Sequence, residues 1–351
     1  MNQSKIKTID SFQGMRFLVF LGIFLTHCGF SGLYRFAAYG VCFFFMLSGY
    51  LQGLKYYDTN KTIPVSSPRS CFNYAWHHLK KLYPLHVMTF LLAIPFTGLF
   101  YSFKTDGIRA LPFWSAVSFL DLSLTKALVP FHYYSFNIVS WYLSAYFWLM
   151  IITLPLIRFI RKHKTLWFIP AAFGLLVLYS CFVIKILPNY SEFLLYVFPI
   201  ARIPEYTIGL TLGLCHDTLY EKIKNLITPL GYLSLLAILV LGIGSSLSLD
   251  LERVLIWVIP NMFLLFFLHK SNSLFCKAIS APFLSKLGGM TGSMYLLHYI
   301  VYHYLLISSI RYTGYVIPII TFLLTLLLAF LYQKFFYPKQ QPTGLIKEGR
   351  I

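Results

Sequence analysis

Apolar runs of about twenty residues, separated by short polar segments, follow one another along almost the whole chain. A helix of that length crosses the hydrocarbon core of a bilayer, which is about 30 Å thick. We therefore predict an all-α polytopic membrane protein with about ten transmembrane helices. The predicted spans are residues 14–33, 38–55, 82–101, 138–157, 166–186, 198–215, 228–247, 254–269, 288–307 and 316–336.

A weaker apolar stretch runs from Leu111 to Leu128 and carries Asp121 and Lys126. Because these charges are costly inside a bilayer, we expect this stretch to lie at the membrane interface. No internal repeat and no hydrophilic block of domain size interrupts the pattern. We expect one integral membrane domain over residues 1–351, with 337–351 as a short cytoplasmic tail.

Composition supports the membrane assignment. The chain has 351 residues, of which 58% are hydrophobic and 11% are charged. Since about a quarter of the residues of a soluble protein are charged, both a soluble globule and a disordered chain are excluded. The six cysteines lie singly along the sequence, with neither a disulfide framework nor the spacing of a metal site, so we expect no bound metal.

The net charge of +18 could suggest nucleic-acid binding, but its distribution indicates membrane orientation instead. With the N-terminus in the cytoplasm, twenty of the 29 Lys and Arg residues fall on the inner side and eight on the outer side. This asymmetry satisfies the positive-inside rule. We therefore predict that both termini are cytoplasmic, and we expect no nucleic-acid partner.

Ionisable residues inside apolar spans are costly and suggest functional sites. The first predicted span contains Arg16 and His27. Eleven residues advance a helix by about three turns and 16 Å, so both side chains share one face, with His27 near the middle of the membrane. The alternative is that Arg16 extends to the interface and His27 is hydrogen-bonded within the bundle.

Other polar residues recur at helical spacing. Arg202 and Glu205 lie one turn apart, and they can form a structural ion pair or bind a ligand together. Tyr295 and His298 are also three residues apart, although a single buried His is often a packing residue. Ser48 and Gly49 allow a close approach of helices, which is common in membranes.

A basic cluster precedes the third span and consists of His77, His78, Lys80 and Lys81. It can bind anionic lipid headgroups, or it can attract a phosphorylated soluble donor to the mouth of a cavity. The sequence contains no phosphate-binding glycine loop, no GxSxG and no HExxH. These absences argue against a nucleotide-binding loop, a membrane hydrolase and a zinc protease.

Six blocks in order resemble the acyltransferase type 3 family of membrane proteins, which O-acylate sugars and other acceptors. The blocks are IDSFQGMRFLVFLGIFLTH, VCFFFMLSGYL, HHLKKLYPL, SWYLSAYFW, RIPEYTIGLTLG and GGMTGSMYLLHY, and they cover residues 9–299. The first block resembles the family's signature of an Arg and a His separated by ten residues. The ordered set is more specific than any block alone.

The resemblance implies transfer of an acyl group, usually acetyl, from cytoplasmic acetyl-coenzyme A to a hydroxyl of a cell-surface or lipid-linked glycan. No cofactor would be bound permanently, because acetyl-CoA or another acyl-CoA is a co-substrate. His27 would be the general base or would accept the acyl group transiently, with Arg16 beside the donor. The remaining implied residues are His78, Lys80, Lys81 and Tyr83 for the donor, and Trp141, Arg202, Glu205, Tyr295 and His298 for the acceptor and the cavity.

The sequence departs from the family pattern at several points. His78 and Lys81 replace the two arginines of the basic motif, so bidentate phosphate recognition is lost. Ala145 and Tyr146 stand where many relatives carry a Glu, so we assign no catalytic carboxylate there. Thr291 and Gly292 replace the usual Ser-Tyr pair.

Two other functions remain open at this point. A transporter or flippase for a glycan or an acyl group would also use intramembrane charges, but it should tolerate loss of the His27 imidazole. A scaffold subunit of a polysaccharide synthase would need no polar residues inside the membrane. For the acyltransferase we expect a multi-pass protein of the cell (plasma or inner) membrane that acts in polysaccharide biosynthesis by O-acetylation; the sequence leaves its oligomeric state undetermined.

Overall fold

The computed structural model describes residues 9–58, 60–163, 166–244, 249–308 and 315–336, and within these ranges the chain is helical with no strand. The proposed tail at 337–351 lies outside them. The α-helices are α1 (Asp10–His27), α2 (Tyr34–Lys55), α3 (Pro68–Leu79), α4 (Tyr83–Ala93), α5 (Leu99–Asp106), α6 (Leu111–Leu122), α7 (Trp141–His163), α8 (Phe168–Ile186), α9 (Pro199–Leu214), α10 (His216–Ile223), α11 (Ile227–Gly244), α12 (Leu249–Val254), α13 (Val258–Lys270), α14 (Leu274–Ile279), α15 (Pro282–Ile307) and α16 (Val316–Phe336). Short 3-10 turns and one π-helical segment, Glu192–Val197, connect them.

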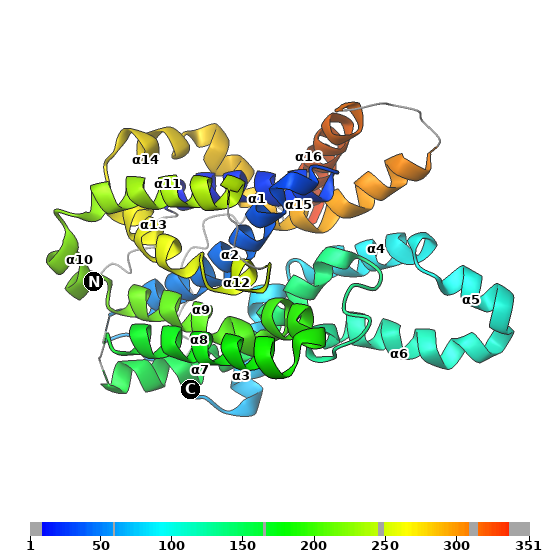
Figure 1. Cartoon of the computed structure of the whole chain (residues 1–351), viewed down its shortest axis with the longest axis horizontal. Coiled ribbons are helices and arrows are strands. Elements are labelled where there is room, and N and C mark those ends of the chain that lie inside the picture. Colours follow the sequence, from blue (N-terminus) through cyan, green and yellow to red (C-terminus); the bar gives the residue numbers. More distant parts are fainter. Residues whose placement is uncertain (1–8, 59, 164–165, 245–248, 309–314, 337–351) are drawn as a thin grey trace, which may run out of the picture.

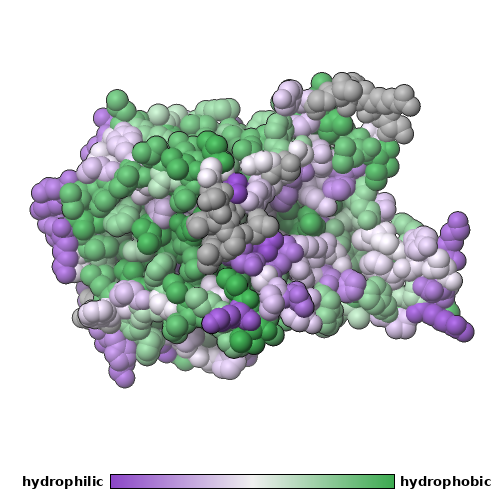
Figure 2. Space-filling model, in the orientation of Figure 1, coloured by the Kyte–Doolittle hydropathy of each residue, from purple (hydrophilic) through white to green (hydrophobic). Residues whose placement is uncertain are grey.

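Six helical segments of the described chain are long and apolar enough to cross a membrane: Tyr34–Lys55, Ile138–His163, Phe168–Ile186, Glu192–Leu214, Ile227–Gly244 and Val316–Phe336. They correspond to six of the ten predicted spans. Tyr83–Phe96 and Leu99–Leu122, bent by 51° at their junction, form a seventh candidate. Apolar side chains cover much of the visible surface, and hydrophilic ones gather at its left edge and at the lower right tip (Figure 2). The structure thus confirms a multi-pass helical membrane protein.

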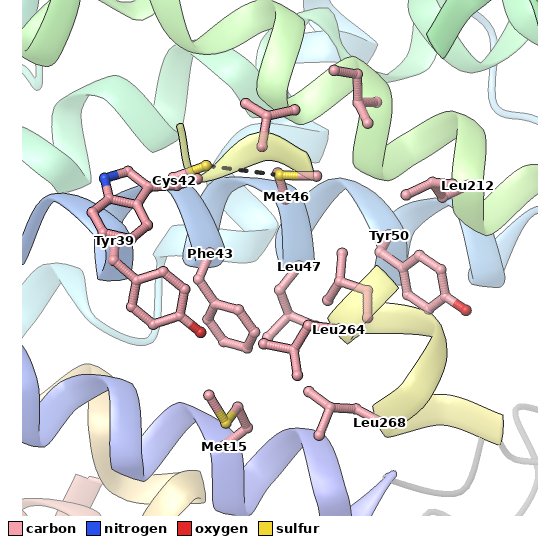
Figure 3. Packing of buried hydrophobic residues seen from close by; sticks show 14 of the residues in the cluster. Met15, Tyr39, Cys42, Phe43, Met46, Leu47, Tyr50, Leu212, Leu264 and Leu268 are labelled. Carbon is pink, nitrogen blue, oxygen red and sulfur yellow. Dashed lines mark hydrogen bonds between the residues drawn. The ribbon is translucent and has the colours of Figure 1, made fainter. Parts of the chain in front are cut away.

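The centre of the molecule is the crossing of α2 and α9, which lie side by side in Figure 1. Two glycines on each helix, Gly49 and Gly53 against Gly209 and Gly213, let the backbones approach so closely that a Cβ on any of them would collide with the facing main chain. These pairs form GxxxG motifs on both helices, which are typical of close helix pairs in membranes. A further face of α2 packs Phe43, Leu47 and Tyr50 against α1 and α13 (Figure 3).

Helix α1 ends earlier than the predicted span 14–33. Its last residue is His27, and the chain then turns at Gly29, whose φ of +96° is a left-handed conformation that glycine adopts without strain. The helix that joins Arg16 to His27 is continuous, whereas the expected continuation to residue 33 is not helical in the same run. His27 stands at the C-terminal end of α1, where the backbone leaves the helix.

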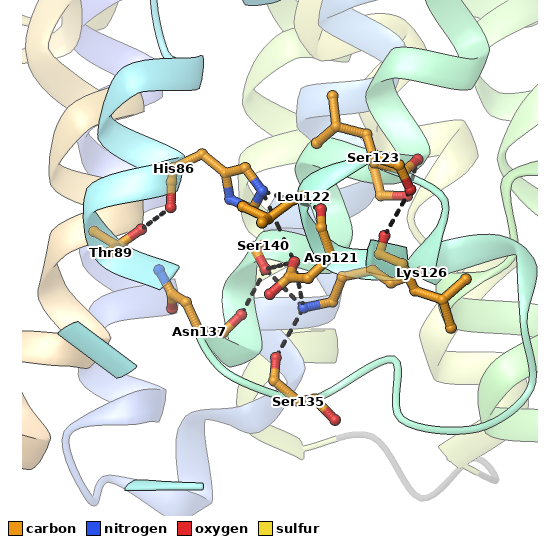
Figure 4. A network of polar contacts seen from close by, with 12 residues as sticks. His86, Thr89, Asp121, Leu122, Ser123, Lys126, Ser135, Asn137 and Ser140 are labelled. Atoms are coloured by element: carbon orange, nitrogen blue, oxygen red, sulfur yellow. Dashed lines mark hydrogen bonds and ion pairs between the residues drawn. The ribbon is translucent and has the colours of Figure 1, made fainter. Parts of the chain in front are cut away.

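The chain passes along α4 and α5 and returns along α6, so that the end of α6 meets the beginning of α4 (Figure 1). The Tyr83 hydroxyl donates to the Leu122 carbonyl at 2.9 Å and closes this hairpin. Asp121 and Lys126 are 1% and 2% exposed, and their charged atoms lie 3.0 Å apart in the polar network of Figure 4. The charges that suggested an interfacial stretch over Leu111–Leu128 are therefore buried and neutralise each other.

Candidate active site

A cavity of about 270 Å³ lies between α1, α2, α3, α7 and α15. Polar and aromatic side chains make up much of its wall, and aliphatic side chains make up the rest. The lining residues are Arg16, Phe20, Ile23, Val41, Phe44, Leu47, Ser48, Leu51, Gln52, His78, Leu82, Tyr142, Leu143, Tyr146, Thr291, Gly292, Tyr295 and Leu296. The volume is near the lower end of the range for small-molecule sites.

The cavity changes from polar to apolar along its length. On α2 its wall runs from Gln52 to Val41, which at 1.5 Å per residue is about 16 Å. On α1 the cavity wall runs from Arg16 to Ile23. The two polar residues Arg16 and Gln52 belong to one end of the cavity, and the two apolar residues Ile23 and Val41 belong to the other end. Ile23 lies one helical turn before His27 on the same side of α1, so the apolar end points toward His27.

Arg16 is partly buried, and its guanidinium donates a hydrogen bond to the Gln13 side chain at 3.2 Å. No carboxylate of the described residues lies within ion-pair distance of it. The rings of Tyr142 and Tyr146, stacked with centroids 6.3 Å apart, line the cavity with it. A guanidinium without a counterion in a cavity favours an anionic or strongly polar ligand.

His78 is held in a defined tautomer at the polar end of the cavity. Its Nδ1 donates to the Tyr74 carbonyl at 2.8 Å, so its Nε2 accepts from the Gln52 amide at 3.1 Å. The Tyr74 hydroxyl in turn donates to Gln52 Oε1. Burial lowers the pKa of His78 below its ordinary value. His78 thus contributes to the cavity wall through its hydrogen bonds to Gln52 and Tyr74, and its role in binding the donor phosphates stays a prediction.

The other expected donor residues lie apart from the cavity wall. Lys80 and Lys81 follow α3 and are exposed, so the positive charge of this segment comes from the two lysines. Tyr83, anchored to Leu122, contacts the ring of Trp76 with centroids 5.0 Å apart. The structure thus brings His78 to the cavity, whereas Tyr83 joins α4 to α6.

His27 and His298 form a pair that joins α1 to α15. Nδ1 of His27 lies 2.8 Å from Nε2 of His298, and the rings are stacked with an interplanar angle of 16°. Nδ1 of His298 lies 3.3 Å from the Met294 carbonyl, to which it must donate. His298 Nε2 then accepts from His27 Nδ1–H, and the lone pair of His27 remains on Nε2. This arrangement leaves Nε2 of His27 able to accept a proton.

Phe20 and Tyr295 connect the histidine pair with the cavity. Both line the cavity, and both contact the ring of His298, with centroid distances of 5.6 Å for Phe20 and 5.8 Å for Tyr295. The pair therefore stands one side-chain layer from the apolar end. No group of three or more His, Cys, Asp or Glu residues that could bind a metal ion occurs in the described part of the chain.

Trp141, Arg202 and Glu205 lie behind the cavity wall and do not line it. Arg202 and Glu205 are both fully buried and 2.9 Å apart, and Arg202 also donates twice to the Tyr196 carbonyl. Trp141 packs on the Tyr196 ring at 4.9 Å. The spacing of Arg202 and Glu205 predicts an ion pair, and the structure contains it. Arg202 and Trp141 both contact Tyr196, Glu205 pairs with Arg202, and none of the three lines the cavity.

Sequence reasoning missed Gln52, Tyr142 and the polar network around Asp121. Gln52 follows Ser48 by one helical turn, so the helical period could have placed both on one face of α2. Tyr142 lies in the SWYLSAYFW block beside the missing carboxylate position. The partners of Asp121 are brought together by the hairpin and give no local sequence signal.

Three comparisons with known proteins give different results. The model of a protein family described as "Acyltransferase domain" matches residues 9–334, which is nearly the whole chain. Neither the comparison with curated proteins nor that with solved structures gave a match.

Proposed function

The chain belongs to this acyltransferase family, and from that membership we propose that it transfers an acyl group, in the first place acetyl, from cytoplasmic acyl-CoA to a hydroxyl of a cell-surface or lipid-linked glycan. The protein is a membrane acyltransferase; the donor and the acceptor are what the proposal adds. The observation that carries the proposal is the free Nε2 lone pair of His27, fixed by His298.

The donor fits the cavity in one direction. Lys80 and Lys81, exposed at the end of α3, attract the phosphates of coenzyme A, and the polar end beyond them offers Gln52 and Arg16 to the polar groups of the pantetheine arm. The apolar end then receives the thioester and its acyl group. Arg16 is about 16 Å from His27 along α1, so it binds the donor away from the reacting carbonyl.

The chemical step needs one base. His27 Nε2 takes the proton of the acceptor hydroxyl while its oxygen attacks the thioester carbonyl carbon. The carbon–sulfur bond then breaks, the coenzyme thiolate leaves, and the proton held by His27 passes to the sulfur. The apolar residues around this end exclude water, which suppresses hydrolysis of the thioester. Because Tyr295 separates the cavity from the histidine pair, its ring must turn aside when the acyl group reaches His27.

The membrane arrangement is part of the proposal. We place ten spans across the cell (plasma or inner) membrane, with both termini and the segment around Lys80 in the cytoplasm. The excess of Lys and Arg on the inner side supports this orientation. The donor would then approach the histidine pair from the cytoplasmic side and the acceptor from the outer side. This arrangement suits polysaccharide biosynthesis, in which the acyl-CoA is cytoplasmic and the glycan is at the cell surface.

Mass analysis of the surface glycan from cells with and without this protein tests the proposal. We expect ester-linked acyl groups on the glycan only when the protein is present. Equal acyl content in both samples would contradict the proposal. Loss of the whole glycan from the surface would instead favour a flippase.

A further inference from the structure

The two ends of the cavity differ in their access to the surface of the protein. At the polar end Leu51 is 37% exposed. At the apolar end Ile23 and Val41 are 2% and 3% exposed. A donor therefore enters the cavity at its polar end, and the group that it carries foremost comes to rest at the apolar end.

Close contact between α1 and α2 closes the apolar end. A Cβ at Gly40, the residue before Val41, would lie 2.8 Å from Ile23 Cδ1, so the Ile23 side chain already fills the space over that glycine. One turn closer to the start of α2, Phe36 Cβ would lie 3.1 Å from a Cβ at Gly22 of α1. The two helices thus meet directly beyond Val41, and the cavity has no exit between them.

Aromatic rings form the side wall of the apolar end and hold one another in place. The ring of Phe44 contacts that of Tyr142 with centroids 6.4 Å apart, and Tyr142 stacks on Phe45 at 4.6 Å. Tyr142 also contacts Tyr295 at 5.6 Å. These rings come from α2, α7 and α15. Because they are packed against each other across three helices, none of them can move aside alone to widen this end.

The wall toward the histidine pair offers no room for a longer acyl chain either. Phe20 and Tyr295 stand between the cavity and the ring of His298. In the proposed reaction the acceptor hydroxyl reaches His27 on this side. A carbon chain that extended past Tyr295 would therefore occupy the position that the acceptor needs.

The length of the acyl chain is limited by these walls. The cavity has a volume of about 270 Å³ in all, and the pantetheine arm of the donor must share it with the acyl group. The carbon chain beyond the thioester carbonyl extends toward Ile23 and Val41, and each further methylene must fit against these side chains. In closed hydrophobic pockets one additional methylene changes the specificity of an enzyme by about 10–200-fold.

We propose that Ile23, Val41 and Phe44 form an acyl-selecting end of the cavity, which admits short acyl groups such as acetyl and excludes hexanoyl and longer chains. This inference rests on the proposed acyl transfer and names the residues that determine which acyl-CoA is the donor. Val41 and Ile23 limit the length of the chain, and Phe44 limits its width.

The kinetic test uses the full-length protein in lipid nanodiscs, with isolated cell-envelope glycan and with acetyl-, propionyl-, butyryl- or hexanoyl-CoA as the donor. For the wild type we expect kcat/KM to fall by about tenfold or more from acetyl- to butyryl-CoA, and transfer from hexanoyl-CoA to be lost. Val41→Ala and Ile23→Ala each enlarge the acyl-selecting end, so each should raise the ratio of butyryl to acetyl transfer by about tenfold.

Leu51→Ala is the matched control, because it removes an aliphatic side chain from the polar end of the same cavity. It should leave the ratio of butyryl to acetyl transfer unchanged. Wild-type transfer of hexanoyl at the same rate as acetyl would overturn the acyl-selecting end and leave the proposed function standing. An equal change of the ratio in all three variants would overturn it as well.

A binding measurement tests the inference independently of transfer. Coenzyme A, acetyl-CoA and hexanoyl-CoA are titrated by calorimetry against the wild type and Val41→Ala. An open apolar cavity would bind the longer chain more tightly, by about fourfold for each buried methylene. We expect the opposite order for the wild type, with hexanoyl-CoA bound about tenfold more weakly than acetyl-CoA, and a smaller difference for Val41→Ala. This result supports the acyl-selecting end even if the wild type transfers no acyl group. Equal or tighter binding of hexanoyl-CoA, or binding of none of the three, overturns it.

Discussion

Nδ1 of His27 lies 2.8 Å from Nε2 of His298, although 271 positions separate the two residues in the sequence. His298 in turn donates to the Met294 carbonyl, so the direction of every hydrogen bond in this chain is fixed. The consequence is that the lone pair of His27 is on Nε2. If His27 is the base, as proposed, His298 is its positioning residue, whereas the sequence assigned His298 only to the shape of the cavity.

His298→Ala should lower kcat by about tenfold to a hundredfold and leave KM for acetyl-CoA nearly unchanged. The reason is that the variant loses the acceptor that holds His27 in its tautomer, which is worth roughly one or two hydrogen bonds. His298→Gln should restore part of kcat, because its amide oxygen can accept from His27 Nδ1–H. Steady-state kinetics of purified variants measure both constants. Equal kcat values for Ala and Gln would assign His298 a packing role only.

Lys80 and Lys81 give a prediction that separates donor binding from lipid binding. Replacing both by Ala should weaken coenzyme A binding at low salt and have less effect at high salt, because exposed charges are screened over about 8–10 Å at physiological ionic strength. Calorimetry in detergent measures the affinity. Lys222→Ala with Lys224→Ala removes the same charge from the C-terminal end of α10 and the residue that follows it, and serves as the control. Unchanged donor affinity in the Lys80 and Lys81 variant would mean that these residues bind lipid headgroups.

The fully buried ion pair of Arg202 and Glu205 predicts a stability effect. Arg202→Ala leaves the Glu205 carboxylate and the Tyr196 carbonyl without their partner, which should cost about 3–5 kcal/mol. Replacing both charged residues by Met should recover part of that loss. Thermal unfolding in detergent measures the difference. A double variant that folds well but has no activity would instead place the pair in substrate binding.

The orientation in the membrane predicts which positions are accessible. A cysteine introduced at position 106, at the end of α5, should react with an impermeant reagent added to intact cells, and a cysteine at position 80 should react only after the cells are opened. The experiment uses a background in which the native cysteines are replaced, because Cys181 is exposed. The reverse labelling pattern would refute the cytoplasmic placement of the Lys80 segment.

The helices that are apolar throughout could be predicted closely from the sequence. The expected span 316–336 begins where α16 begins, and 166–186 differs from α8 by two residues at its start. In these helices the apolar pattern is continuous, so the boundaries of the pattern are also those of the helix. The pairing of Arg202 with Glu205 followed from helical spacing in the same way.

Features that depend on tertiary contacts were not accessible to the same reasoning. The end of α1 at His27 requires the positive φ of Gly29, which an apolar pattern does not indicate. Asp121 and Lys126 looked like interfacial charges because nothing in the local sequence shows that they neutralise each other. The contact of His78 with Gln52 was not expected because Gln52 lies on another helix.

The central claim is that the imidazole of His27 performs acyl transfer, and His27→Gln tests it most directly. Glutamine keeps a polar side chain of similar reach but has no lone pair that can act as a base near neutral pH, and general-base assistance contributes about 10²–10⁴-fold. The measurement is the transfer of labelled acetyl from acetyl-CoA to glycan by purified wild type and variant, together with coenzyme A affinity. We predict that transfer falls by about 10²-fold or more while affinity and folded yield are retained. A folded His27→Gln protein that acylates at near the wild-type rate would contradict the account and favour a transporter.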